Sequence, residues 1–179
     1  MGKSLLNVGS EIMSAPFHFI SSDKRFELCL PGDLMNQVLA RCSAAGSCET
    51  GGILVGKYSR DQRIAEVTAI SDSPEDSVGG HTIFIRGIRG LCRWLQNLWR
   101  SNSHYYLGEW HFHPGLNTQP STLDKGTMTD IARTEAYQCP EPILLIVGGN
   151  ETHGWFFYAQ VTTRDGAIVE LHRCGQKKS

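Results

Sequence analysis

The chain has 179 residues, of which 40% are hydrophobic and 20% are charged, and its formal net charge is −1. This composition is typical of one folded domain with a substantial core and excludes a disordered chain. A balance so close to neutral gives no electrostatic reason to expect nucleic acid or membrane binding. The N-terminus lacks the apolar core of a signal peptide, and no apolar run is long enough to span a bilayer. We therefore expect a cytoplasmic protein.

Six cysteines occur without a Cys-x-x-Cys pair, at spacings that resemble neither a zinc knuckle nor a small disulfide scaffold. We expect most of them to be buried thiols that a reducing compartment keeps free.

The chain order predicts a loosely held N-terminal arm over residues 1–22, a folded domain over 23–174 and a solvated tail over 175–179. Alternating apolar residues predict a first strand over 26–30. Asp33 is expected to cap a helix over 34–45, which stops at Gly46. The other elements expected in this half are a strand over 49–58, a strand over 63–71 that pairs with it as a hairpin, and an irregular loop over 72–80.

Apolar residues spaced three and four apart predict an amphipathic helix over 84–100, despite Gly87 and Gly90. The elements expected after it are a strand over 105–112, a helix over 122–137, a buried strand over 142–147, a turn over 148–150 and a hairpin over 155–162 and 167–173. This order indicates an α/β domain with one mixed sheet and helices on its faces.

The segment GEWHFHPGLNTQPSTLD carries the strongest chemical signal. Its two histidines, His111 and His113, are two positions apart on a predicted strand, so their imidazoles point to the same face. A helix start follows, with Ser121 as its cap and Asp124 three residues later. The first turn of this helix can bring the Asp124 carboxylate back to the imidazoles. Two nitrogens and one carboxylate suit zinc and leave a fourth position for water, which such a zinc ionises near neutral pH.

A hydrolytic zinc site also needs a base, and Glu49, at the start of the strand ETGGILVG, is the candidate. Glu109 is a rival because it has the same parity as His111 and His113 and could act as a ligand or as the base. Two strand residues span about 6.6 Å, so Glu109 and His113 lie about 13 Å apart and cannot easily share one metal. Hydrogen-bonding support of a ligand suits Glu109 better.

Each of these residues also has a purely structural explanation. A histidine on a strand can be a packed, hydrogen-bonded side chain, Ser121 can be only a helix cap, and Glu49 can be a surface residue. Four other histidines, His81, His104, His153 and His172, have no partner at a ligand-like spacing, so we expect them to be structural. Trp110 and Phe112 should face the core, opposite the histidines.

The whole pattern, Glu49 followed by His111-x-His113-Pro114 and then Ser121-x-x-Asp124, resembles the JAMM motif of the MPN (Mov34/JAB) metalloproteases. The resemblance covers about residues 26–173 and includes the ETGGILVG strand. It implies an α/β fold made of a single MPN/JAB-like domain, with a curved mixed β-sheet flanked by helices.

The resemblance also implies roles for these residues. His111, His113 and Asp124 match the ligands of one Zn²⁺ per chain, and Glu49 matches the general acid/base. Ser121 matches the serine that stabilises the oxyanion. The stretch between Asp124 and the next strand is too short for a second zinc-binding insertion, so a single metal is expected.

The family hydrolyses amide bonds, typically the isopeptide or peptide bond after the C-terminal tail of a ubiquitin-like protein. The loop over 72–80 lies where relatives vary an insertion that contacts the substrate. The length and the GEWHFHP segment are similar to bacterial members, some of which belong to anti-phage CBASS operons. In those operons an E1/E2-like enzyme attaches a CD-NTase nucleotide cyclase through its C-terminus, and the JAMM protein removes it. The implied partner is thus a protein with an extended C-terminal tail, for example a conjugated CD-NTase.

Two other functions stay open at this point. A peptidase could trim the tail of a ubiquitin-like or sulfur-carrier protein to expose its terminal glycine. A catalytically silent MPN scaffold is the second, although scaffold members usually lack metal ligands and this chain lacks none.

Overall fold

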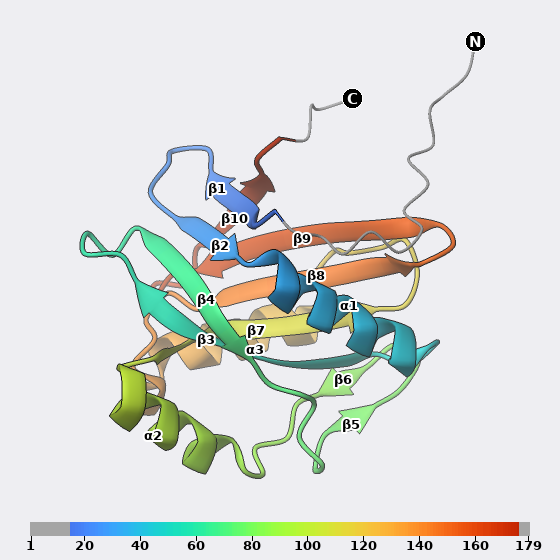
Figure 1. The fold of residues 1–179 in the computed structure, drawn as a ribbon, viewed down its shortest axis with the longest axis horizontal. Helices are drawn as coiled ribbons and strands as arrows, with labels where there is room; N and C mark the ends of the chain where they lie inside the picture. The colour runs from blue at the N-terminus through green and yellow to red at the C-terminus, as the bar shows by residue number, and fades with distance from the viewer. Residues whose placement is uncertain (1–14, 176–179) are drawn as a thin grey trace.

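The computed structural model describes residues 15–175 (Figure 1), and eight of the strands within them form a sheet that closes on itself. The order of strands around this barrel is β1-β10-β9-β8-β7-β3-β4-β2, and β2 pairs back to β1. The β2–β4 and β7–β8 pairs are parallel and the others are antiparallel, which confirms a mixed sheet. The barrel strands are β1 Phe17–Ser21, β2 Glu27–Leu30, β3 Thr50–Tyr58, β4 Ile64–Ile70, β7 Tyr105–His113, β8 Ile143–Asn150, β9 Gly154–Thr162 and β10 Ile168–Arg173.

Helices cover both faces of this sheet, as Figure 1 shows with α1 in front of it and α3 behind. The apolar stripe of α1 (Gly32–Ala45) packs into the larger core cluster together with Trp110 and Phe112 of β7. On the other face, Met128 and Ile131 of α3 (Thr122–Arg133) pack on β3, β7 and β8 in a second cluster. The alternation of β7 between these clusters confirms that Trp110 and Phe112 face away from the histidines. No helix within residues 15–175 has both the length and the apolar character needed to cross a membrane.

The expected loose arm is wrong for its last part, because Phe17–Ser21 forms β1. Phe17, Phe19 and Ser21 are buried in alternation, and β1 pairs with both β2 and β10. The apolar–polar alternation of FHFIS was the signal for this strand. Residues 1–14 of the arm and 176–179 of the tail lie outside the described part of the chain.

The helix over 34–45 is present, but Asp33 does not cap it. Pro31 occupies the cap position without a side-chain hydrogen bond, and Asp33 lies in the first turn of α1, where a negative charge favours the helix dipole. Gly46 ends the helix with φ 62°, as expected.

The expected helix over 84–100 begins only at residue 91, as α2 (Leu91–Asn102). Phe84–Ile85 is instead the short strand β6, which pairs with β5 (Val78–Gly79) inside the stretch expected to be irregular. Gly90, with φ 80°, stands immediately before the helix in a left-handed conformation. The backbone N–H groups of Ile88 and Arg89 donate to the Asp76 carboxylate, so this segment satisfies its donors outside a helix.

Two later elements differ only at their ends. The helix after the motif ends at Arg133, and a separate 3-10 turn, η1 (Glu135–Tyr137), follows it. Strand β8 extends to Asn150 and so includes the residues that were expected to form a turn. The hairpin of β9 and β10 is confirmed.

Candidate metal centre

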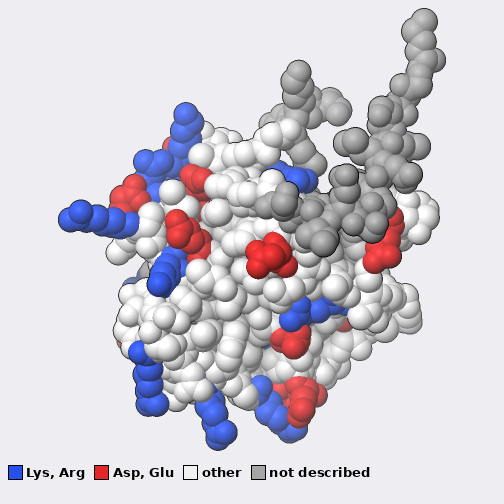
Figure 2. All heavy atoms as spheres, viewed as in Figure 1, with Lys and Arg blue, Asp and Glu red and all other residues white. Residues whose placement is uncertain are grey.

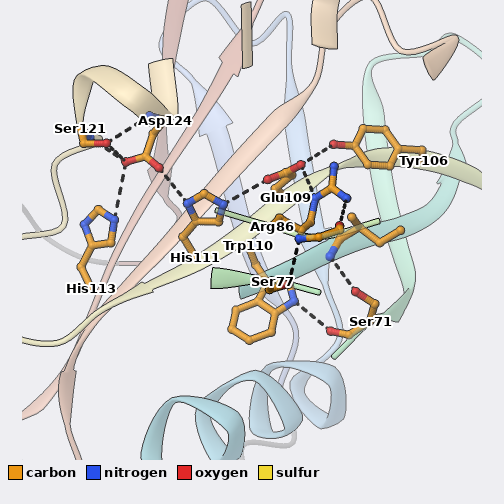
Figure 3. Close-up of polar contacts among 12 residues, drawn as sticks. Ser71, Ser77, Arg86, Tyr106, Glu109, Trp110, His111, His113, Ser121 and Asp124 are labelled. Carbon is orange, nitrogen blue, oxygen red and sulfur yellow. Dashed lines mark hydrogen bonds and ion pairs between the residues drawn. The ribbon is translucent and has the colours of Figure 1, made fainter. Parts of the chain in front are cut away.

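Strand β7 and the start of α3 bring His111, His113 and Asp124 together (Figure 3). One ligand atom from each of the three side chains lies within 4.8 Å of the other two. This is the only such group of His, Cys, Asp or Glu residues in the described part of the chain. His111 is only 4% exposed and Asp124 is also buried, whereas His113 is partly exposed at the end of β7.

The first turn of α3 fixes the orientation of the Asp124 carboxylate. The Ser121 hydroxyl accepts from the Asp124 backbone N–H at 3.1 Å, and Asp124 Oδ2 accepts from the Ser121 N–H and hydroxyl at 2.7 Å each. This is a capping box with Asp as its acid, which confirms the cap role of Ser121. The other oxygen, Oδ1, lies 2.9 Å from His111 Nδ1, and Oδ2 lies 3.6 Å from His113 Nε2.

The electrostatics of this cluster favour a cation. Burial by itself lowers the pKa of His111, but its hydrogen bonds to Asp124 and Glu109 outweigh burial and raise that pKa to about 9. Burial likewise opposes ionisation of Asp124, yet the bonds from His111 and Ser121 hold its pKa well below the usual range. Burial lowers the pKa of His113, which favours the neutral imidazole that binds metals. The donor set itself, two imidazoles and one carboxylate with ligand atoms within 4.8 Å of one another, fits a divalent metal ion.

Glu49 lies at the edge of this cluster, directly before β3. In the β3–β7 register Gly51 is opposite His111 and Thr50 is opposite Phe112, so continuing the register places Glu49 beside His113. The Glu49 side chain is half-buried. Burial and the nearby Asp124 charge raise its pKa, while His111 partly opposes them. The sequence-predicted base thus lies within electrostatic range of the predicted ligands.

Gly51, the first glycine of the Gly51-Gly52 pair in β3, occupies a position with no room for a side chain. A Cβ at this position would meet the backbone carbonyl of Trp110 and would lie 2.8 Å from Phe84 and 2.9 Å from the His111 ring. Glycine is therefore required for the His111 ring to lie against β3, with the Phe84 ring packed edge-on at a centroid distance of 5.3 Å.

Glu109 contacts the other ring nitrogen of His111. Its Oε2 lies 3.1 Å from His111 Nε2, while Oε1 accepts from Arg86 Nε at 2.6 Å and from the Tyr106 hydroxyl at 3.2 Å. Glu109 is 1% exposed. Burial disfavours its ionised form, but the bonds from His111 and Arg86 keep its pKa below the usual value. Glu109 is thus not among the three side chains whose ligand atoms lie within 4.8 Å of one another, and it contacts His111 on the ring nitrogen that faces away from Asp124.

Sequence reasoning missed three residues around His111, namely Phe84, Arg86 and Tyr106. Phe84 and Arg86 alternate with an exposed Ile85, which is a strand signal, but the helical spacing of the residues that follow concealed it. The regular alternation of side chains along a strand could not predict that Tyr106 lies on the same face as Glu109. The β3–β7 register shifts between Leu54 and Val55, and this bulge brings Tyr106 to the same face as Glu109.

Comparisons with known proteins identify the family of this fold. Residues 31–161 match the family described as prokaryotic homologs of the JAB domain. A CD-NTase/cGAS isopeptidase from Enterobacter hormaechei subsp. hoffmannii is 39% identical over 153 residues, which cover 86% of this chain and 84% of that protein. The probable metalloprotease y4qB from Sinorhizobium fredii is 26% identical over 148 residues, covering 75% and 85% of the two chains.

A second CD-NTase/cGAS isopeptidase, from Escherichia coli, is 37% identical over 106 residues, which cover 57% of this chain and 63% of that one. Among solved structures, the solution structure of protein DSY2949 from Desulfitobacterium hafniense matches with a TM-score of 0.57. It is 20% identical and covers 78% of this chain and 86% of that chain, so it supports the fold alone.

The fold and the site thus define an enzyme of the metalloprotease type. The chain belongs to the JAB family, in its prokaryotic branch, which confirms the resemblance to the JAMM/MPN proteins.

Proposed function

We propose that the protein is a zinc-dependent isopeptidase that hydrolyses the amide bond after the C-terminal tail of a ubiquitin-like or similarly conjugated protein. The observation that carries this proposal is the meeting of His111, His113 and Asp124 within 4.8 Å, with Glu49 at its edge. A bound zinc would supply a Lewis acid and a water that ionises near neutral pH.

In this proposal Glu49 moves the proton. It takes a proton from the attacking water and delivers it to the leaving amine, which is the work of a general acid/base. The raised pKa of Glu49 suits both steps, because a carboxyl group that titrates closer to neutral pH can both accept the proton and give it up again. Burial causes most of this shift, and the Asp124 charge adds to it.

Ser121 is proposed to stabilise the oxyanion in addition to capping α3. Its hydroxyl donates to Asp124 Oδ2 in this structure and also lies at the positive end of the helix. A hydroxyl rotates freely, so the same group can donate to a carbonyl oxygen that gains charge in the transition state.

Exposed apolar side chains near the site support a protein substrate. Val78 of β5 is 59% exposed and Ile85 of β6 is 50% exposed, and this hairpin lies against the backbone of Glu49, whose N–H donates to Gly80. Leu123, beside Asp124, is also exposed. An extended tail gains affinity by pairing with a free strand edge and placing alternate side chains on such residues.

The surface charge does not suggest a nucleic acid. On the face shown in Figure 2, basic and acidic side chains are interspersed around a wide uncharged area. The formal net charge of −1 agrees with this distribution. We infer that recognition depends on the shape and apolar contacts of a tail rather than on long-range attraction.

The relatives named CD-NTase/cGAS isopeptidases favour a conjugated CD-NTase as the particular substrate. We therefore propose a deconjugating role in antiviral defence within the cytoplasm. Cleavage would release the cyclase from the protein to which its C-terminal tail has been joined.

The test compares two tail-linked substrates of one CD-NTase. In the first, an E1/E2-like enzyme joins its C-terminus to a lysine of a second protein, and in the second, a peptide bond joins the same tail to a small fusion partner. Release from the first, absent with Glu49→Gln enzyme, supports an isopeptidase. Cleavage of the fusion alone would favour the tail-trimming alternative, and no release from either would contradict the proposed substrate class.

A further inference from the structure

A buried chain of polar contacts runs from His111 away from the metal centre to Arg86. Glu109 links the two, with one carboxylate oxygen 3.1 Å from His111 Nε2 and the other 2.6 Å from Arg86 Nε (Figure 3). The side chains of His111, Glu109 and Arg86 are 5%, 1% and 9% exposed. Tyr106 adds a third donor to Glu109, so the carboxylate is held from several sides.

Arg86 lies in a different part of the fold from Glu109 and His111, which are both on β7. It directly follows β6, within the segment between β4 and α2 that also forms β5. Its NH1 donates to the Gly87 carbonyl, and the Gly87 N–H donates to the Ser77 hydroxyl, so Arg86 is fixed within this segment.

The β6 segment has two faces with different contacts. Phe84 and Arg86 point inward, where Phe84 packs edge-on against the His111 ring and Arg86 holds Glu109. Ile85, between them, is exposed, as is Val78 opposite it on β5. The inward face thus contacts His111 directly through Phe84 and indirectly through Arg86 and Glu109, while Ile85 and Val78 on the outward face are exposed.

Charge explains why the contact needs an arginine. If His111 held a metal through Nδ1, which faces Asp124, its Nε2 would carry a proton that the Glu109 carboxylate, 3.1 Å away, could accept. An ionised carboxylate that is 1% exposed needs a buried cation beside it, since the Tyr106 hydroxyl is neutral. Arg86 supplies that charge in a geometry that lysine cannot fully reproduce, because its guanidinium bonds Glu109 and Gly87 together.

We propose that Arg86 is a positioning residue that acts through Glu109 to orient His111, and that it couples the placement of the β5–β6 segment to metal affinity. The coupling is reciprocal, so metal binding also steadies this segment beside the site. This inference rests on the proposed metal role of His111, but it does not depend on the choice of substrate.

The first test measures zinc affinity of the metal-free full-length protein by competition with a chromogenic chelator. Arg86→Gln and Glu109→Gln should each weaken zinc binding by about 10- to 100-fold, the usual effect of losing a hydrogen-bond partner of a ligand. The double variant should bind no more weakly than the weaker single variant, because both changes break the same chain of contacts. Arg86→Lys should recover part of the affinity, since it restores the charge.

Arg89→Gln is the matched control, because Arg89 lies in the same segment and forms an exposed ion pair with Glu75. It should bind zinc like the unaltered protein. If Arg86→Gln also does so, the proposal is overturned, even if that variant is less thermally stable. If the unaltered protein binds no zinc, the proposed function itself fails, and the two failures are thereby distinguished.

A second measurement needs no variant and covers the case in which Arg86→Gln does not fold. Hydrogen exchange of the unaltered protein should slow over residues 76–88 when zinc is added, with the turn over 59–63 as an unaffected reference. Slower exchange at residues 111–124 without any change over 76–88 would contradict the coupling.

Discussion

The Asp124 carboxylate lies 2.9 Å from His111 Nδ1, although the two residues are 13 positions apart in the chain. The strand end supplies one partner, the first helical turn supplies the other, and the capping contact with Ser121 fixes the angle between them. Because the cap also bonds Oδ2, removing the carboxylate should affect both the metal centre and the helix start.

Asp124→Ala should sharply lower the zinc content of the purified protein, because one of three protein ligands is lost. Asp130→Ala, an exposed change on the same helix, is the control and should leave zinc content unchanged. Metal analysis by mass spectrometry measures both. Full occupancy in the Asp124 variant would remove this residue from the ligand set.

Glu49→Gln should keep its zinc, but its turnover should fall by about 10²- to 10⁴-fold, the range for a positioned general acid/base. The amide has the shape of the carboxylate and lacks its basic oxygen. Single-turnover cleavage with zinc-saturated enzyme measures the effect. Near-normal turnover of this variant, together with an inactive zinc-saturated Glu109→Gln enzyme, would transfer the role of base to Glu109.

Gly51→Ala should lower the free energy of unfolding by about 1–3 kcal/mol, because the new methyl group overpacks the contact among Trp110, Phe84 and His111. Gly126→Ala is the contrasting change. It lies within α3 with nothing within 4 Å of the added Cβ, so it should stabilise the protein by about 0.5–1 kcal/mol. Urea denaturation of the two variants should therefore give opposite signs, and a neutral Gly51→Ala would argue against the close approach.

Thiol reagents should label the protein without acting on the buried cysteines. Burial raises the pKa of Cys42 to about 12 and of Cys139 to about 11, so neither forms a reactive thiolate near neutral pH. Cys92 and Cys174 are exposed and should react first with a colorimetric disulfide reagent. Rapid labelling of Cys42 in the native protein would mean that the core opens more readily than this packing implies.

These cysteines also correct an expectation from the sequence. All six are free, as expected, but only Cys42 and Cys139 are buried. Cys42 lies on the inward stripe of α1, where the helical spacing made burial predictable. The exposure of Cys92 and Cys174 depends on where α2 begins and where β10 ends, which local spacing did not define.

The meeting of His111, His113 and Asp124 could be predicted from the sequence because its geometry is local. Strand parity places His111 and His113 on one face, and the Ser121 cap places Asp124 in the first turn of α3. The position of Glu49 depends on the pairing of β3 with β7, and the family resemblance indicated it before the register was known.

The surroundings of His111 were less predictable for physical reasons. Arg86 reaches Glu109 across the fold, and Tyr106 does so only because a bulge reverses the parity of β7. Closure of the sheet depends on β1. Its apolar–polar alternation can be seen in the sequence, but its pairing with β10, which joins the two ends of the domain, cannot. Contacts of this kind are decided by tertiary packing and not by local pattern.

The most direct test of the metal centre follows one tail-linked conjugate through metal removal and restoration. Phenanthroline or EDTA should abolish its cleavage, one equivalent of zinc per chain should restore it, and a serine-directed reagent should have no effect. Cysteine alkylation should likewise leave cleavage intact. Full cleavage by protein from which metal analysis shows all metal has been removed would contradict the proposed zinc-dependent mechanism.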